Sequence, residues 1–283
     1  MEKIAILVDS GSDISPELIA EMGIHVLPLK ILYGDKVYSD GENIEPQEVY
    51  ARFPEEIPKT STPNFAEVTE LAEALRDAGY THLLAVCISS GLSGTYQNIC
   101  TALKSVQGIV CRAIDTKNIS IGAGALALYA ARLAKEGVPF EELCRKVEQN
   151  VGHSRVFYYM DTLDYLRAGG RIGRVTGALG SLLNIKPIIS CNPQGVYYTV
   201  AMIRGRKRGI QKLIDCVAGK VDEKRAALFA VMHGNAPEAV EEVSAELIRR
   251  FPKGKIFMKK QINASLAVHT GPGLVGILLF QPA

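Results

Sequence analysis

The first half of the chain alternates short apolar runs with helical patterns, and this alternation constrains the fold more than any other feature. The expected strands are residues 4–8, 25–33, 82–88 and 109–114. The expected helices begin at Ser15-Pro16, where Ser is the N-cap and Pro occupies the first turn, and then cover residues 46–53, 65–78 and 119–135. Strands that alternate with helices in this way predict a mostly parallel α/β sheet.

The second half has a different pattern, with strands joined directly by turns. The segment Cys191-Asn192-Pro193-Gln194-Gly195 predicts a hairpin turn between strands at residues 186–190 and 196–203. Further strands are expected at 155–159, 227–232, 256–262 and 274–280, with helices at 140–151, 206–218 and 236–251. Paired neighbouring strands favour an α+β domain with antiparallel elements. We therefore expect an α/β domain over residues 1–154 and an α+β domain over residues 155–283.

A loop rich in serine and glycine follows the strand at residues 82–88. Its sequence, SSGLSG at residues 89–94, leads into a helix expected to open at about Thr95. Backbone N–H groups at a helix N-terminus lack intrahelical partners and carry the positive end of the helix dipole. Together with the hydroxyls they form a site for a phosphate or a carboxylate. The alternative is that the serines cap the helix and the glycines turn the chain.

Two other segments contain candidate binding residues. Thr60-Ser61-Thr62-Pro63 precedes a helix, so its hydroxyls either cap that helix or supply a second wall of hydroxyl donors. His269 precedes a Gly-rich turn, where its side chain either faces a ligand or is structural. Ser93 does not match the nucleophile elbow of hydrolases, because residue 95 is Thr where that motif has Gly.

Charge is distributed unevenly along the chain. The net charge is +2, but residues 160–220 contain ten Lys or Arg against three Asp, a local excess of +7. Within this segment the arginines of the Gly-rich loop at 165–174 suit recognition of phosphate or carboxylate by planar guanidinium groups. Either the segment is a docking face for an acidic partner, or it is a solvated surface.

Several classes of site and partner are not expected. The chain has no phosphate-binding P-loop, no GxGxxG motif and no metal-ligand spacing, which predicts no cofactor and no metal. The sequence lacks the alternation of basic and aromatic residues that would indicate nucleic-acid binding. The most membrane-like run, residues 121–134, is too short to span a bilayer and includes Arg132, so no transmembrane segment is expected. Six cysteines without a CxxC pair predict reduced thiols and a cytoplasmic location.

Taken in order, the motifs resemble those of the DegV family of bacterial fatty-acid-binding proteins over essentially the whole chain. Each motif alone is weak, and the ordered set is specific. The matching segments are Val8-Asp9-Ser10 with Ser12-Asp13, Thr60-Ser61-Thr62-Pro63, SSGLSGTYQ at 89–97, Asp115-Thr116, LRAGGRI at 166–172, Lys186-Pro187 and HTGPG at 269–273.

The resemblance implies that a two-domain α/β protein buries one long-chain fatty acid between its domains. It implies that the carboxylate is held by the hydroxyls of Thr60 or Ser61 and of Ser90, with Ser93 near and His269 at the same polar end. The α/β domain would then carry the hydroxyl-rich carboxylate-binding loops. The α+β domain would carry the Gly-Arg loop and a lid over the lipid.

The resemblance also implies a protein partner. Members of the best-known kind present the fatty acid to a separate fatty acid kinase, which makes an acyl phosphate, and Arg171 looks like a contact for that kinase. On this reading the chain is a carrier and not an enzyme. The alternative is a small-molecule kinase-like or hydrolase-like α/β enzyme that uses the serine loop at residues 89–93.

Overall fold

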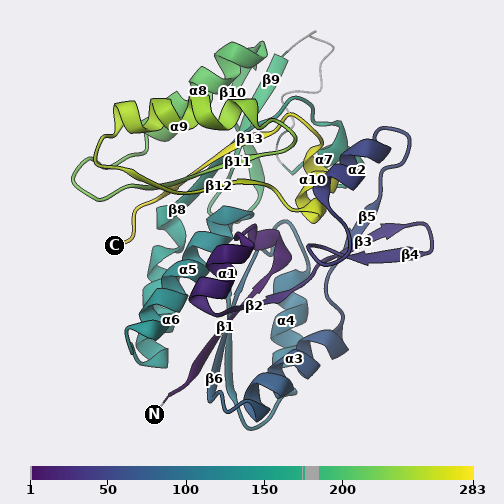
Figure 1. Ribbon diagram of the computed structural model, residues 1–283, viewed down its shortest axis with the longest axis vertical. Helices are drawn as coiled ribbons and strands as arrows, with labels where there is room; N and C mark the ends of the chain where they lie inside the picture. Colours follow the sequence, from purple (N-terminus) through teal and green to yellow (C-terminus); the bar gives the residue numbers. More distant parts are fainter. Residues whose placement is uncertain (1, 174, 176–184) are drawn as a thin grey trace.

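The computed structural model describes residues 2–173, 175 and 185–283, and Figure 1 shows two main blocks stacked along the long axis. The lower block in that view is built on a parallel sheet, and the upper block on a larger mixed sheet. The expected architecture, a parallel α/β sheet followed by an α+β unit, is therefore confirmed. Arg174 of the expected Gly-Arg loop lies outside the described residues.

The parallel sheet has the strand order β2-β1-β6-β7. Its strands are β1 (Ile4–Asp9), β2 (Ile24–Leu27), β6 (His82–Cys87) and β7 (Val110–Asp115). The two-residue period of β1 sends Ala5 and Leu7 to one face and Ile6 and Val8 to the other. The first face is covered by α3 (Phe65–Asp77) and α4 (Thr95–Leu103), and the second by α5 (Ile121–Lys135).

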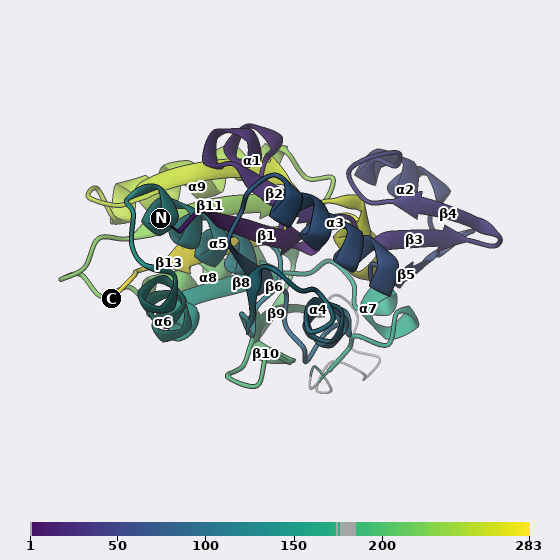
Figure 2. The same ribbon diagram turned by 90° about the horizontal axis from the view of Figure 1, so that it is seen from below.

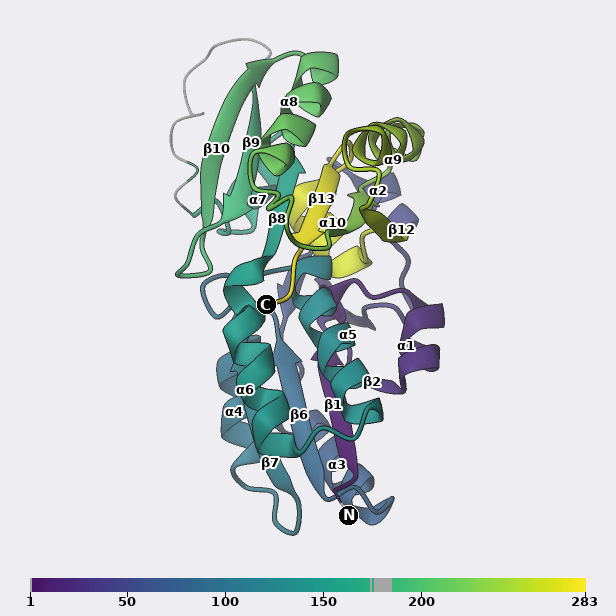
Figure 3. The same cartoon turned by 90° about the vertical axis from the view of Figure 1, so that its left-hand side faces the viewer.

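The mixed sheet has the strand order β10-β9-β8-β13-β11-β12, and all its pairs are antiparallel except β11 with β12. Its strands are β8 (Ser154–Tyr159), β9 (Ile185–Cys191), β10 (Tyr197–Arg204), β11 (Leu228–His233), β12 (Lys255–Gln261) and β13 (Val275–Phe280). Helices α8 (Arg206–Ala218) and α9 (Glu238–Arg250) pack on one face. Strands β9 and β10 form the expected hairpin, and Figure 3 shows its turn directed toward the parallel-sheet block.

Helix α5 packs against both sheets and joins the two blocks into one hydrophobic core. Its small residues allow this close approach. A Cβ added at Gly124 would lie 2.5 Å from the Ser12 carbonyl oxygen, and one added at Gly122 would lie 2.7 Å from Val156 of β8. The remaining helices of the parallel block are α1 (Pro16–Met22), capped by Ser15 as expected, and α6 (Phe140–Asn150).

A third, small antiparallel sheet projects at one side of the molecule in Figures 1 and 2. It consists of β3 (Lys30–Tyr33), β4 (Lys36–Ser39) and β5 (Lys59–Ser61). This sheet and α2 (Pro46–Arg52) pack against α10 (Ala264–Thr270), which comes from the far end of the chain. Segments from both sides of the expected boundary at residue 154 thus share one small core, and the division into 1–154 and 155–283 stays a prediction.

The strand expected over residues 25–33 is wrong as a single element. The chain there forms β2 and β3, which belong to different sheets. Pro28 lies between them and has no N–H to continue a ladder. The Leu29 N–H leaves the ladder as well and donates to the Ser10 hydroxyl at 3.0 Å.

Candidate functional site

A small cavity lies where the parallel sheet, the small sheet, α10 and the β9–β10 hairpin meet. Its volume is about 50 Å³. The lining residues are Leu29, Thr60, Ile88, Leu92, Ser93, Ile119, Arg171, Tyr197, Ser265, Leu266, His269 and Thr270. Three of them, Ile88, Leu92 and Ser93, follow the carboxyl end of β6, where open α/β sheets bind ligands. The cavity therefore combines aliphatic side chains with hydroxyls, one imidazole and one guanidinium.

Thr60 and His269, which both line this cavity, contact each other. The Thr60 hydroxyl and Nε2 of His269 are 2.7 Å apart and share a hydrogen bond, although 209 residues separate them in sequence. Thr60 is half-buried on β5, and strand alternation leaves Ser61 exposed. The capping alternative for Thr60 and Ser61 is wrong, because the side chain of Asn64 caps α3 by accepting from the Glu67 N–H.

His269 is held as a neutral imidazole. Burial, with a smaller contribution from the nearby charge of Arg171, lowers the pKa of His269 from 6.5 to about 4. Its Nδ1 is buried and has no hydrogen-bond partner among the described residues. A Cβ added at Gly169 would lie 2.2 Å from this Nδ1, so the ring fits only because residue 169 has no side chain.

Arg171 supplies the positive charge on the cavity wall. Its Nε donates to the Leu92 carbonyl at 3.3 Å and its Nη1 to the Gly169 carbonyl at 2.6 Å. These two bonds orient the guanidinium and leave further N–H groups available. Arg171, which the resemblance suggests as a contact for a partner protein, thus also lines the cavity.

Ser93 lies on the same cavity wall, just before α4. Its hydroxyl accepts from the Thr95 N–H at 3.2 Å and lies 2.8 Å from the Thr95 hydroxyl. The serine loop does open the helix at Thr95, as expected. Of the serines in that loop, Ser93 is the one that lines the cavity.

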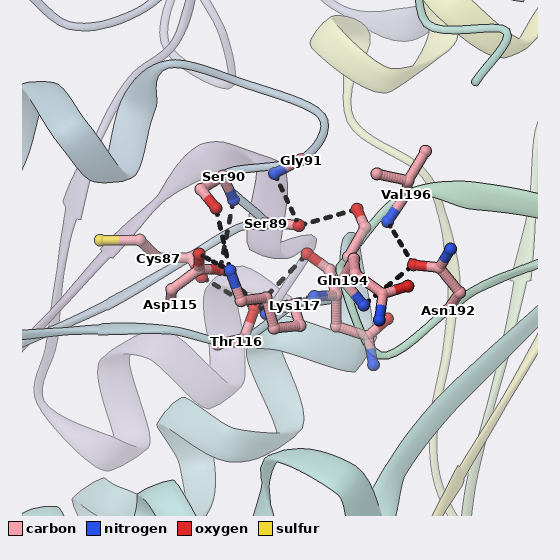
Figure 4. Close-up of polar contacts among 12 residues, drawn as sticks. Cys87, Ser89, Ser90, Gly91, Asp115, Thr116, Lys117, Asn192, Gln194 and Val196 are labelled. Atoms are coloured by element: carbon pink, nitrogen blue, oxygen red, sulfur yellow. Dashed lines mark hydrogen bonds and ion pairs between the residues drawn. The ribbon is translucent and has the colours of Figure 1, made fainter. Parts of the chain in front are cut away.

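Ser90 occupies a different position, which Figure 4 shows. It is exposed, its N–H donates to Asp115 at 3.2 Å, and its hydroxyl accepts from Lys117 at 3.1 Å. Ser89 is buried and donates to the Gly195 carbonyl of the β9–β10 hairpin at 2.8 Å. These bonds direct Ser89 and Ser90 away from the cavity that Ser93 lines.

The structure thus brings together Thr60, Ser93, His269 and Arg171, and it separates Ser61 and Ser90 from them. Sequence reasoning missed α10, the seven-residue helix that carries His269, because such a short helix lacks a strong periodic pattern. It also missed the steric role of Gly169. The Gly doublet before Arg171 was the available signal.

The described residues include neither a metal-binding cluster nor a membrane-spanning helix. No group of three or more His, Cys, Asp or Glu side chains is placed to hold a metal ion. No helix in the described part of the chain has the length and apolar character needed to cross a membrane.

Comparisons with known proteins give a consistent result. Residues 3–281 match the model of a family described as uncharacterised proteins of the DegV family. A DegV domain-containing protein of Clostridium acetobutylicum is 39% identical over 281 residues, covering 99% of this chain and all of the relative.

Solved structures are similar over the same length. A fatty-acid-binding DegV family protein from Thermus thermophilus superposes with a TM-score of 0.92 at 28% identity, covering 99% of both chains. DegV of Bacillus subtilis, described as a fatty acid binding protein, gives 0.90 at 27% identity, covering 99% of this chain and 100% of the other. A stearic acid-binding protein from Eubacterium ventriosum gives 0.91 at 26% identity, covering 100% of this chain and 99% of the other.

Proposed function

The chain belongs to the DegV family, and from this premise we propose that it binds a long-chain fatty acid with the carboxylate in the cavity beside Thr60 and His269. The observation that carries this proposal is the convergence of Thr60, Ser93, His269 and Arg171 on one cavity from four distant parts of the chain. Relatives with the same fold are described as fatty-acid-binding.

The four side chains suit a carboxylate. An ionised carboxylate accepts hydrogen bonds only, and Thr60 and Ser93 offer hydroxyl donors. A neutral imidazole donates from whichever ring nitrogen holds the proton, and Arg171 adds a full positive charge. Hydrogen bonds to a charged group are stronger than those between neutral groups.

The acyl tail requires more room than the cavity offers. A volume of about 50 Å³ accommodates a few water molecules but not a long acyl chain. We infer that the aliphatic lining, Leu29, Ile88, Leu92, Ile119 and Leu266, moves apart to admit the chain. The lid over the lipid expected from the sequence stays a prediction.

We further propose that the carrier presents the carboxylate to a separate fatty acid kinase, with Arg171 at the contact. Arg171 is only partly buried, so its remaining N–H groups can serve both the ligand and a partner. This role would leave acyl-phosphate chemistry to the kinase, which agrees with a carrier that is not itself an enzyme.

The geometry gives the hydrolase alternative little support. A serine nucleophile needs a histidine base that a third group orients. Ser93 bonds to Thr95, whereas His269 bonds to Thr60 through Nε2 and has no partner at Nδ1 within the described residues. The side chains of Ser93 and His269 thus both line the cavity without forming a catalytic pair.

Organic extraction of the purified protein followed by mass spectrometry tests the proposed function. We expect a co-purifying fatty acid at close to one molecule per chain, and a strong loss in a Thr60→Ala/Ser93→Ala variant. Ser61→Ala is the matched control, because Ser61 is adjacent to Thr60 and exposed. Absence of any fatty acid, together with no uptake from added oleate, would contradict the proposal.

A further inference from the structure

A second and larger cleft lies on the other side of the serine loop. Its volume is about 460 Å³, and it shares no lining residue with the cavity described above. It is bounded by residues 116–118 after β7, by residues 151–152 and 154–157 around the start of β8, and by the β9–β10 turn. Volumes of about 300–1,000 Å³ are typical of sites for small molecules.

The charge of this cleft is strongly one-sided. Lys117, Arg155 and Lys220 line it, and no Asp or Glu does. Lys117 pairs with Asp115 at 2.6 Å, whereas Arg155 and Lys220 have no ion pair within the described part of the chain. Arg155 uses its Nε to donate to the Gly152 carbonyl, which leaves its two terminal nitrogens available.

The walls of the cleft are held in place by hydrogen bonds. Lys117 has a left-handed backbone, with φ of 52°, and its N–H donates to Asp115 at 3.0 Å. The Asn118 amide donates to the Ser154 carbonyl at 2.8 Å, and the Asn192 oxygen accepts from the N–H groups of Gln194 and Val196. Left-handed backbone in a non-glycine residue is uncommon and is found often at ligand sites.

The pKa of the neighbouring His153 reflects both its burial and the positive charge around the cleft. Burial lowers the pKa of His153, and the charges of Arg225 and Arg155 lower it further. His153 lies in sequence between Gly152 and Ser154, which line the cleft, but does not itself line it. Positive charge therefore gathers around this end of the cleft from more than its own lining.

We propose that this cleft binds a small molecule that carries two or more phosphate charges. Arg155 and Lys220, which have no ion pair within the described residues, lie beside the paired Lys117, and no carboxylate lines the cleft; this favours a polyanion over a monocarboxylate. The guanidinium of Arg155 matches the geometry of phosphate oxygens, and the ammonium groups add point charges. The phosphates come either from an inorganic polyphosphate or from a nucleoside phosphate.

Calorimetric titration at low salt tests the proposal with two probes, inorganic pyrophosphate and ADP. We expect saturable binding of at least one probe, weakened by at least about tenfold per lost contact in Arg155→Ala/Lys220→Ala. Pyrophosphate binding as tight as ADP would identify the phosphates as the whole determinant, and tighter ADP binding would identify a nucleoside phosphate. Lys117 is left intact because it also holds Ser90 and Asp115.

The matched control is Lys36→Ala/Lys104→Ala, which makes the same change of net charge at exposed positions that do not line the cleft. Its affinity should stay within about twofold of the parent. Equal weakening in both double variants, or no saturable binding of either probe, would overturn the proposal. Lys220→Glu is the second variant should the double substitution fail to fold, and it must also weaken binding.

Discussion

His269 shows how residue-scale chemistry at the cavity depends on its neighbours. Its ring is partly buried, with Nδ1 enclosed, and it is bonded to Thr60 and packed closely against Gly169. Arg171, bonded to the Gly169 carbonyl, places a positive charge nearby. A neutral ring beside a cation leaves the net charge of the site positive, as an incoming carboxylate requires.

Loss of a cavity hydroxyl should weaken fatty-acid binding. A hydrogen bond to a charged group contributes roughly 1.5–3 kcal/mol, so Thr60→Ala and Ser93→Ala should each lower the affinity roughly 10- to 150-fold. Calorimetry with palmitate measures this. Because Ser90 is exposed and bonded to Lys117 outside the cavity, we now expect Ser90→Ala to change the affinity little. A larger loss in Ser90→Ala than in Ser93→Ala would contradict the assignment.

Gly169→Ala should displace His269. The new Cβ would lie 2.2 Å from Nδ1, and overpacking of this kind costs about 1–3 kcal/mol. We expect a lower midpoint of thermal unfolding and weaker fatty-acid binding. Gly152→Ala is the control, since a Cβ there meets nothing within 4 Å. If Gly169→Ala and Gly152→Ala had the same unfolding midpoint and the same fatty-acid affinity, the close packing of Gly169 against His269 would not matter for stability or binding.

Arg171→Ala tests the dual role of the guanidinium. We expect weaker fatty-acid binding, because a cation is lost from the cavity wall, and a larger fall in acyl-phosphate formation when a cognate kinase is supplied. Arg171→Lys, which keeps the charge but not the planar fork, should recover part of the affinity. If Arg171→Ala left the fatty-acid affinity unchanged, Arg171 would act only as a contact for the partner.

At the scale of elements, α10 depends on tertiary contacts for its formation. Seven residues are too few for an isolated helix to be stable in water. Two buried carboxylates hold its first turn: Asp13 accepts from the Asn263 N–H at 2.7 Å, and Asp40 accepts from the Ser265 N–H at 3.2 Å. Asp40 also accepts from the hydroxyls of Ser10 and Ser265. These bonds set the position of His269 at the other end of the helix.

Asp40→Asn should loosen this anchor. The amide nitrogen cannot accept from Ser265 or Ser10, and an unsatisfied buried polar group costs about 1–3 kcal/mol. Urea unfolding should show a lower free energy of unfolding, and fatty-acid affinity should fall with it. Asp35→Asn, in the exposed β3–β4 turn, is the control. Full stability in Asp40→Asn would mean that the anchor is dispensable.

At the scale of the whole molecule, the buried carboxyl groups of Asp9 and Asp13 link stability to pH. Burial raises the pKa of Asp9 from 3.8 to about 7 and that of Asp13 from 3.8 to about 6. A folded pKa above the unfolded value means that the folded state binds the proton more tightly. The resulting stabilisation is complete below pH 3.8 and is lost as the pH rises through the folded pKa.

The difference in free energy of unfolding between the parent and Asp9→Asn isolates the contribution of Asp9 from that of other titrating groups. Relative to the variant, the parent should lose stability on the order of 4 kcal/mol between about pH 4 and pH 7, because the pKa of Asp9 rises from 3.8 to about 7 on folding. Chemical unfolding at a series of pH values measures the difference. Asp35→Asn again serves as the exposed control. A difference that does not vary with pH would show that Asp9 is ionised throughout this range.

Local patterns in the sequence were enough to predict most strands and helices. The Ser15-Pro16 start of α1, the β9–β10 turn and the alternation of β1 side chains between two buried faces are consequences of short-range sterics and periodicity. Thr60, Ser93 and His269 were also identifiable as candidates, because hydroxyls and imidazole beside turns suit an anionic ligand.

Only the tertiary structure decided which of these candidates meet. Ser90 and Ser93 lie in one loop, and they are separated by bonds to distant partners, such as that of Ser89 to Gly195, 106 residues away. The break of the chain into β2 and β3, the formation of α10 and the entry of Arg171 into the cavity likewise depend on long-range contacts. Sequence periodicity reports on a residue's own element, whereas a site is made by the contacts between elements.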